Sequence, residues 1–285
     1  MTEPRRHHYV PRFYLSRFTD EHDRFWVWDK IVDRVFLSSP VAVAVESDFY
    51  KIHDFVPLGH DPYLMEKQLA GMERQVAAIT GQWLEWLRTM KPREKVEIPA
   101  INRQIVSRFI SLQFLRTADT RDTFIAWHTQ EFPDQVIDEL DKIRLHTEMI
   151  WNMDLVNSIA EYVEKAFWIF ARNETGTPFV TSDNPVAFRT NDNRMWLKAG
   201  FIDTAYVVYP LSPDVVMYCH GREHWSRIER LDRCLSPVEL TTEMIESENS
   251  GQVFMARRFL LSPINDFVHA RDFAATIGTD KYANY

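Results

Sequence analysis

The sequence has little of three things that define common protein classes: cysteine, glycine and long hydrophobic runs. Only Cys219 and Cys234 occur among the 285 residues, which excludes a disulfide scaffold and a four-cysteine zinc site. With eight glycines there is no glycine-rich phosphate loop, so no nucleotide cofactor is expected. No run approaches the roughly 18 apolar residues of a membrane span, and no apolar stretch follows the N-terminal arginines as in a secretory signal. We therefore expect a cytoplasmic protein without a membrane partner.

Positive charge is also scarce, except at the N-terminus. The chain carries 33 Lys and Arg against 41 Asp and Glu, a formal net charge of -8, which argues against a protein that coats duplex nucleic acid. The segment RRHHYVPRFYLSRF, from Arg5 to Phe18, nevertheless holds four arginines, two adjacent histidines and four aromatic residues. This contrast predicts a local basic site on a negative body.

The middle of the chain is expected to be a helical bundle, over about residues 62–173. From Pro62 to Met90, apolar residues recur at every third or fourth position, the pattern of an amphipathic helix. Pro99 suits the first turn of a second helix. Two further periodic segments, about 134–150 and 154–172, complete the expected bundle.

Strands are expected on both sides of this bundle. Four segments have the β-branched and aromatic composition of strands: residues 24–30, 33–39, 178–189 and 205–219. The first two predict a β-hairpin, residues 41–50 fit a strand or a short helix, and residues 237–262 predict a helix that Ser250 and Gly251 could interrupt. We expect an α+β fold in which the hairpin joins the later strands in a mixed or antiparallel sheet, packed against the bundle in a single domain over residues 1–285.

Several separated motifs give the chain a family resemblance. HHYVPRFYLSRF is followed by FWVWDK, FISLQFLRT, FVTSDNPV, YPLSP and ARRFLLS. In this order, and over nearly the whole chain, they resemble the uncharacterised bacterial family catalogued as domain of unknown function 4238. The resemblance implies no reaction, but it does imply which positions matter: His8, Pro11, Tyr14, Leu15, Gln113, Arg116, Thr117, Ser182, Asp183, Asn184, Pro185, Pro210, Leu211 and Pro213, together with the helix acid Glu73.

The adjacent histidines are the first candidate site residues. Neighbouring side chains on an extended segment point to opposite faces, so at most one of His7 and His8 is expected to enter a given site. His8 could act as a general base or metal ligand, as in the first motif of HNH nucleases, which this string resembles. His7, Arg12 and Tyr14 could contact a phosphate-bearing ligand. The alternative is that His8 bonds within the fold while the aromatic residues anchor the terminus.

Gln113 and Arg116 form a second candidate pair. They lie three residues apart on an otherwise apolar helix, so their side chains are neighbours. A guanidinium beside an amide suits a phosphate or carboxylate ligand. In the alternative, Arg116 bonds an acid of the protein, either Asp183 or Glu73, because a buried arginine needs an acidic partner.

The string TSDNP, from Thr181 to Pro185, follows an apolar strand and gathers polar side chains at its end, where sites are commonly built. Asp183 could bind a divalent metal, Mg²⁺ or Mn²⁺, or act as a base, while Asn184 positions a water or a substrate oxygen. His8 and Glu73 are the other proposed metal ligands. The alternative is an Asx-turn, in which these side chains satisfy their own backbone.

A last motif, HGREH from His220 to His224, fits the inverted zinc-protease signature H-x-x-E-H, which requires a helix. Gly221 and the strand-like residues before it argue against that helix. Taken together, the candidates predict first a metal-dependent phosphodiesterase or nuclease acting on RNA or DNA, for example in a defence or toxin setting. A noncatalytic ligand- or protein-binding module is the alternative and a zinc metalloprotease the third. The sequence leaves the oligomeric state open.

Overall fold

The computed structural model describes residues 6–91, 93–202 and 204–279. Arg5 of the N-terminal motif lies outside these residues. The fold is α+β, as the hydrophobic patterning predicts, with several helices and both antiparallel and mixed sheets. Among the described residues, no helix has both the length and the apolar character needed to cross a membrane.

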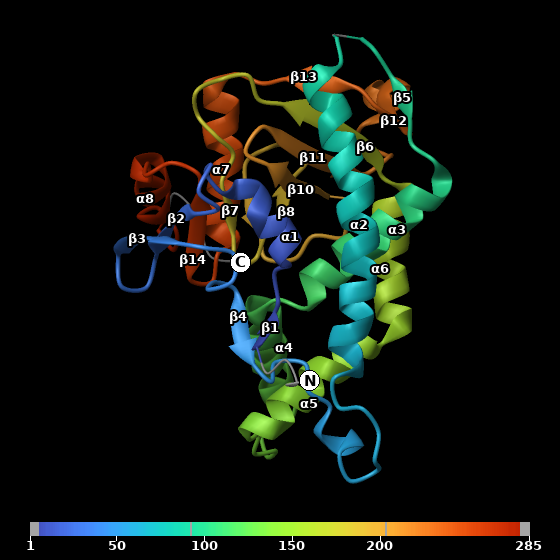
Figure 1. Ribbon diagram of the computed structural model, residues 1–285, viewed down its shortest axis with the longest axis vertical. Coiled ribbons are helices and arrows are strands. Elements are labelled where there is room, and N and C mark those ends of the chain that lie inside the picture. Colours follow the sequence, from blue (N-terminus) through green and yellow to red (C-terminus); the bar gives the residue numbers. More distant parts are fainter. Residues whose placement is uncertain (1–5, 92, 203, 280–285) are drawn as a thin grey trace.

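Helices cover the sheets from two sides (Figure 1). On one side, α2 (Leu64–Thr89), α3 (Ala100–Leu115) and α6 (Met153–Lys165) run next to one another. On the opposite side, α7 (Thr242–Met255) and α8 (Val268–Ala274) pack together. The sheets lie between these two groups, so strands distant in sequence are brought into one core.

The expected bundle is present, with one additional helix. Buried side chains of α2 recur at helical spacing: Met65, Leu69, Val76, Trp83, Leu84 and Leu87. α3 begins directly after Pro99, and α5 (Glu139–Trp151) and α6 overlap the two later periodic segments. α4 (Ala118–Glu131) was not expected from the sequence, because it has few apolar residues. Its start is fixed by Thr117, whose side chain accepts a hydrogen bond from the backbone of Thr120.

The prediction of one helix over residues 154–172 is wrong in its second half. α6 ends at Lys165, and the strand β6 (Phe167–Arg172) follows at once. All six residues of β6 are buried. A strand that is buried on both faces has no alternating pattern, and a short apolar run then cannot be distinguished from the continuation of a helix.

A six-stranded sheet forms the centre of the molecule. Its strand order is β13-β6-β11-β10-β8-β9. Besides β6, its members are β8 (Ala187–Thr190), β9 (Trp196–Leu197), β10 (Ala205–Ser212), β11 (Val215–His220) and β13 (Pro237–Glu239). All pairs are antiparallel except β13 with β6. Every residue of β10 and β11 is buried, because helices or loops cover both faces there.

The predicted hairpin is present in a second sheet. β2 (Phe25–Asp29) and β3 (Arg34–Ser38) pair antiparallel, and the sheet continues through β14 (Phe259–Ser262) to β7 (Thr181–Ser182). The hairpin therefore shares a sheet with the TSDNP segment, as expected. The strands within 205–219 belong to the other sheet and do not pair with the hairpin. The prediction of a helix over 237–262 is also wrong at both ends, where β13 and β14 flank α7.

Short elements complete the fold. β1 (Arg6–His8) pairs with β4 (Val45–Ser47), which resolves the ambiguous segment 41–50 as a short strand, and β5 (Val96–Glu97) pairs with β12 (Cys234–Leu235). Single helical turns lie between the longer elements: α1 (Arg12–Leu15), η1 (Ser16–Phe18), η2 (His53–Phe55) and η3 (Ser226–Leu231).

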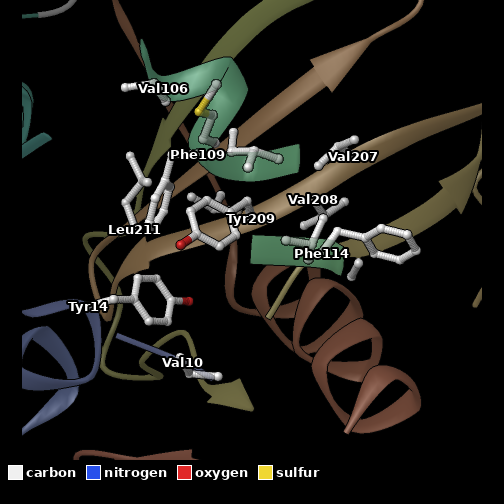
Figure 2. Close-up of a cluster of buried hydrophobic side chains, with 14 of the residues drawn as sticks. Val10, Tyr14, Val106, Phe109, Phe114, Val207, Val208, Tyr209 and Leu211 are labelled. Carbon is white, nitrogen blue, oxygen red and sulfur yellow. The ribbon is translucent and has the colours of Figure 1, made fainter. Parts of the chain in front are cut away.

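The apolar side chains of the N-terminal segment pack into the main core (Figure 2). Val10 and Tyr14 pack with Val208 and Tyr209 of β10, and Phe109 of α3 lies in the same cluster. All five side chains are at least 95% buried. Burying one such side chain contributes about 1.5–3 kcal/mol. The terminus is thus held by the core that the bundle and the central sheet share.

Candidate functional site

The two adjacent histidines lie in different surroundings. His7 is buried, and its Nδ1 accepts a 2.9 Å hydrogen bond from the backbone N–H of Tyr50. His8 is half-buried, and its Nε2 donates to the carbonyl oxygen of Pro40 at 3.0 Å. Burial lowers the pKa of His8 to about 4, although the bond to Pro40 opposes this shift. His8 is therefore neutral at pH 7 and bonds to the fold; its role as a catalytic base stays a prediction.

Tyr14 joins the two main sheets. Its hydroxyl donates to the carbonyl oxygen of Pro210 in β10 and accepts from the hydroxyl of Thr181 in β7, both at 2.8 Å. Its ring stacks on that of Tyr209, with 5.2 Å between centroids and 15° between planes (Figure 2). Tyr14 thus connects three of the motifs, and these contacts favour a structural role over a ligand contact.

Gln113 and Arg116 are buried and bond to each other. The Oε1 of Gln113 accepts from Nε and Nη2 of Arg116 at 3.2 and 2.9 Å, and its Nε2 donates to the backbone carbonyl of Tyr9 at 3.1 Å. Nη1 of Arg116 lies 2.7 Å from a carboxylate oxygen of Glu73. Burial alone would lower the pKa of Arg116, but Glu73 outweighs it and the pKa is raised. The predicted acidic partner is confirmed as Glu73, and Asp183 makes no such pair.

Asp183 bonds to a different part of the chain. It is 3% exposed, and its two oxygens accept hydrogen bonds from the backbone N–H groups of Arg257, Arg258 and Phe259, at 2.9 to 3.0 Å. Burial raises its pKa to about 6, although these bonds oppose the shift. The alternative of an Asx-turn is wrong for Asp183, because the backbone groups that bond to its side chain belong to the turn between α7 and β14. Its catalytic role stays a prediction, although these contacts favour a structural one.

Asn184 belongs to a polar network that the sequence did not reveal. Its Nδ2 donates to Asp119 at 3.0 Å, and Lys198 lies 3.4 Å from the same carboxylate. Lys198 and Lys30 also reach carbonyl oxygens in the last turn of α7, where cations are favourable. Asp119 was missed because its helix has no apolar periodicity. The network locks the turn of the hairpin and the TSDNP segment to α7.

The three proposed metal ligands do not converge. His8 bonds to Pro40, Glu73 to Arg116, and Asp183 to the turn at residues 257–259. Within residues 6–91, 93–202 and 204–279, no group of three His, Cys, Asp or Glu side chains is placed to hold a metal ion. The donor set predicted for Mg²⁺ or Mn²⁺ therefore does not fit a common ion, and we derive no step through one.

The H-x-x-E-H string does not form a helix. His220 is the last residue of β11, and residues 222–224 form a turn. The imidazoles of His220 and His224 therefore do not share a helical face with Glu223 between them, which zinc-protease chemistry of this class requires. Gly221 and the preceding strand residues had pointed to this outcome.

The sequence did not single out Arg17 and Tyr209, which lie near the contacts of Arg116, since the charges of both Arg17 and Arg116 act on Tyr209. Arg17 of η1 donates to the hydroxyl of Thr80 at 2.5 Å and points toward the carbonyl oxygens of Ala77 and Leu211, both at 3.5 Å. No carboxylate lies within ion-pairing distance of Arg17 among the described residues. Burial lowers its pKa below the ordinary value. The spacing from Tyr14 to Arg17, three residues in one motif, could have indicated its position.

Tyr209 is the second such residue. It is 2% exposed, and its hydroxyl has no hydrogen-bond partner. The charges of Arg17 and Arg116 both favour its ionised form, although burial dominates and raises its pKa. We call Arg17, Glu73, Arg116 and Tyr209 the arginine site. It carries two positive charges and one negative charge, and two of its residues, Arg17 and Glu73, are only half-buried.

Two further charged residues lie near the candidate site residues, Arg12 near His8 and Glu66 near Glu73. Arg12 is exposed on α1, and its charge acts on His8, so these two predicted site residues are brought together. Glu66 lies two helical turns before Glu73 on α2 and is half-buried. Burial and the charge of Glu73 raise the pKa of Glu66 to about 7. Its position was not predicted, because one acid in a helix carries no sequence signal.

The fold and these contacts define an α+β protein in which distant motifs converge on a shared core and a polar site beside it. The chain belongs to the family described as Protein of unknown function (DUF4238), whose family model matches residues 6–264. The resemblance inferred from the motifs is thereby confirmed. No curated protein and no solved structure gives a significant match to the chain.

Proposed function

We propose that this protein is a binding module for an anionic, phosphate-bearing ligand, which it holds at the arginine site. The observation that carries the proposal is the uncompensated charge of Arg17, which bonds only to neutral oxygens of the protein. A charge removed from water ordinarily needs a partner of opposite sign. A phosphate group would supply it, and the planar guanidinium can donate two parallel hydrogen bonds to such a group.

The neighbours of Arg17 support the same class of ligand. The hydroxyl of Tyr209 has a free proton to donate, so a phosphate oxygen would give this buried group the partner that it lacks. The half-buried ring of Phe13 lies 5.3 Å below the guanidinium of Arg17. A partly exposed aromatic face beside a cation suits the stacking of a base. Nucleotides and single-stranded nucleic acid are therefore the phosphate-bearing ligands that we favour.

Hydrolysis of a phosphodiester in RNA or DNA is the second candidate. Glu66 favours it, because a carboxyl with a pKa near 7 can exchange a proton at neutral pH and lies close enough to Glu73 and Arg116 to feel their charges. Binding is placed first because His8 and Asp183, the pair proposed for catalysis, already bond to backbone groups. The metal dependence of such a reaction remains a prediction.

The test is the binding of fluorescein-labelled single-stranded RNA and DNA, followed by anisotropy, with adenosine monophosphate and inorganic phosphate as competitors. We expect binding to the wild-type protein and a loss of about tenfold or more in Arg17→Met, since a charge-assisted hydrogen bond contributes about 1.5–3 kcal/mol. If the wild type binds none of these probes, or Arg17→Met binds them as tightly, the proposal fails.

Two controls separate charge from geometry. Arg34→Ala removes an exposed arginine on β3, away from the arginine site, and should leave binding unchanged. Arg17→Lys keeps the positive charge but loses the planar guanidinium that can donate two parallel hydrogen bonds, and should bind with intermediate affinity. The same samples are assayed for cleavage with Mg²⁺, Mn²⁺ or Zn²⁺. If the wild type cleaves the nucleic acid and Glu66→Gln does not, the protein is a hydrolase rather than only a binding module.

A further inference from the structure

A cavity away from the arginine site lies between the segment of residues 51–55 and helix α5. Its volume is about 500 Å³, within the range of about 300–1,000 Å³ that small-molecule sites occupy. The α5 side is one helical face that runs from Leu140 to Trp151. No residue of the arginine site lines this cavity.

The walls of the cavity are in part apolar and aromatic. The apolar part of the lining consists of Ile52, Phe55, Leu140, Ile143 and Trp151, and the other six lining residues are polar or charged. The rings of Phe55 and Trp151 stand at 68° to each other with 6.4 Å between centroids. Leu140 is 51% and Trp151 38% exposed. Large apolar side chains that remain this exposed inside a concave surface would be covered by a flat apolar ligand.

The 51–55 side supplies two polar groups that form neither a hydrogen bond nor an ion pair within the described residues. The Nε2 of His53 is buried and makes no hydrogen bond. Lys51 forms no ion pair with any described carboxylate, and its ammonium group lies 5.8 Å from the centre of the Tyr63 ring. Arg144, on the opposite wall, is by contrast occupied by Asp54 at 3.0 Å and by Asp141 at 3.2 Å.

We propose that this cavity binds a planar, apolar molecule that carries one acidic group. Its rings lie against Phe55 and Trp151, and its acidic group lies at Lys51 and His53. The one unpaired acid of the lining, Glu148, is on the α5 wall, so it repels an anion from that side and favours this orientation. The inference does not depend on the proposed function, because the two sites share no residue.

The test uses two fluorescent probes of similar size, the anion 1-anilinonaphthalene-8-sulfonate and the neutral N-phenyl-1-naphthylamine. We expect one molecule of the anion per chain, bound more tightly than the neutral probe. Lys51→Met should lower the affinity for the anion to that for the neutral probe and leave the neutral probe unaffected. Trp151→Leu should weaken both, since it removes the aromatic wall.

Two control variants distinguish binding in the cavity from nonspecific binding to other apolar surface. Trp127→Leu changes a tryptophan on α4 that is 52% exposed and does not line the cavity, so both probes should bind as before. Arg17→Met should also leave both affinities unchanged, which separates this site from the arginine site. If Trp151→Leu destabilises the fold, Lys51→Met still decides. Equal affinity of the two probes for the wild type, or no effect of Lys51→Met, would overturn the inference.

Discussion

At the scale of single residues, the two arginines of the arginine site differ in how their charge is compensated. Arg116 is 1% exposed and bonds to both Glu73 and Gln113. Removing one partner of a buried pair leaves the other uncompensated and costs about 3–5 kcal/mol. We therefore expect Arg116→Ala to lower the free energy of unfolding by an amount of this order, measured by urea denaturation. A change below about 1 kcal/mol, within the range of exposed ion pairs, would show that the pair contributes little.

Glu66 should make stability depend on pH. Its pKa is raised from 4.5 to about 7 in the folded state, so the folded protein holds a proton that the unfolded chain releases. The resulting stabilisation is fully present below pH 4.5 and is lost as the pH rises to about 7. The free energy of unfolding of Glu66→Gln, minus that of the wild type, should therefore increase between pH 5 and 8. Taking this difference cancels the contributions of His8 and Asp183. A difference that is flat over this range would contradict the assignment.

A contact was predictable from the sequence only where both partners are side chains of complementary charge. The need of Arg116 for an acid predicted a partner among Asp183 and Glu73, and the partner is Glu73. Asp183 was assigned to the wrong partners, because the N–H groups that it accepts belong to the backbone at residues 257–259, and backbone donors leave no trace in the sequence. Arg17 was missed for the opposite reason, since its exceptional feature is the absence of an acid.

At the scale of elements, periodicity located the amphipathic helices and failed where burial is complete. α2 has one polar face, so its pattern is clear, and its observed limits lie within two residues of those predicted. β6 is buried on every side and was mistaken for the end of α6. α7 was predicted although its sequence contains Gly251. The structure shows why a glycine stands there, because the ring of Trp196 packs against this position.

Gly251 is required because the side chain of Trp196 packs closely against it, not because of its backbone conformation. A Cβ atom added there would lie 2.5 Å from the ring of Trp196, which is 2% exposed and has no room to move away. We expect Gly251→Ala to lower the melting temperature, although alanine favours a helix by about 1 kcal/mol over glycine. Gly81→Ala in α2, where the added atom meets nothing within 4 Å, should raise it. Similar shifts of the same sign in both variants would contradict the packing argument.

At the scale of the whole molecule, the N-terminal segment holds the layers together. Tyr14 bonds to both main sheets, and Gln113 holds the backbone of Tyr9 against α3. The sequence predicted that these motifs converge, since each combines polar side chains with an apolar run. It did not predict that the strands divide into two sheets. The hairpin sheet depends on β14, which pairs with both β2 and β7, and the residues of β14 were predicted to be the end of a helix.

Tyr14→Phe tests this role. The substitution keeps the ring but leaves the carbonyl oxygen of Pro210 and the hydroxyl of Thr181 without their shared partner. We expect a loss of about 1–3 kcal/mol in the free energy of unfolding. If residues 1–285 form a single domain, far-ultraviolet circular dichroism and tryptophan fluorescence should report one coincident transition in both proteins. Separate transitions would contradict the single domain.

The binding of a phosphate group at Arg17 can be measured through the melting temperature of the protein with and without adenosine monophosphate. A ligand that binds only the folded state stabilises it, by about 2.7 kcal/mol at 100 times its dissociation constant. We expect the nucleotide to raise the melting temperature of the wild type and of Arg34→Ala, and to have little effect on Arg17→Met. An equal rise in Arg17→Met, or no rise in the wild type with this nucleotide or with single-stranded RNA, would contradict the proposal.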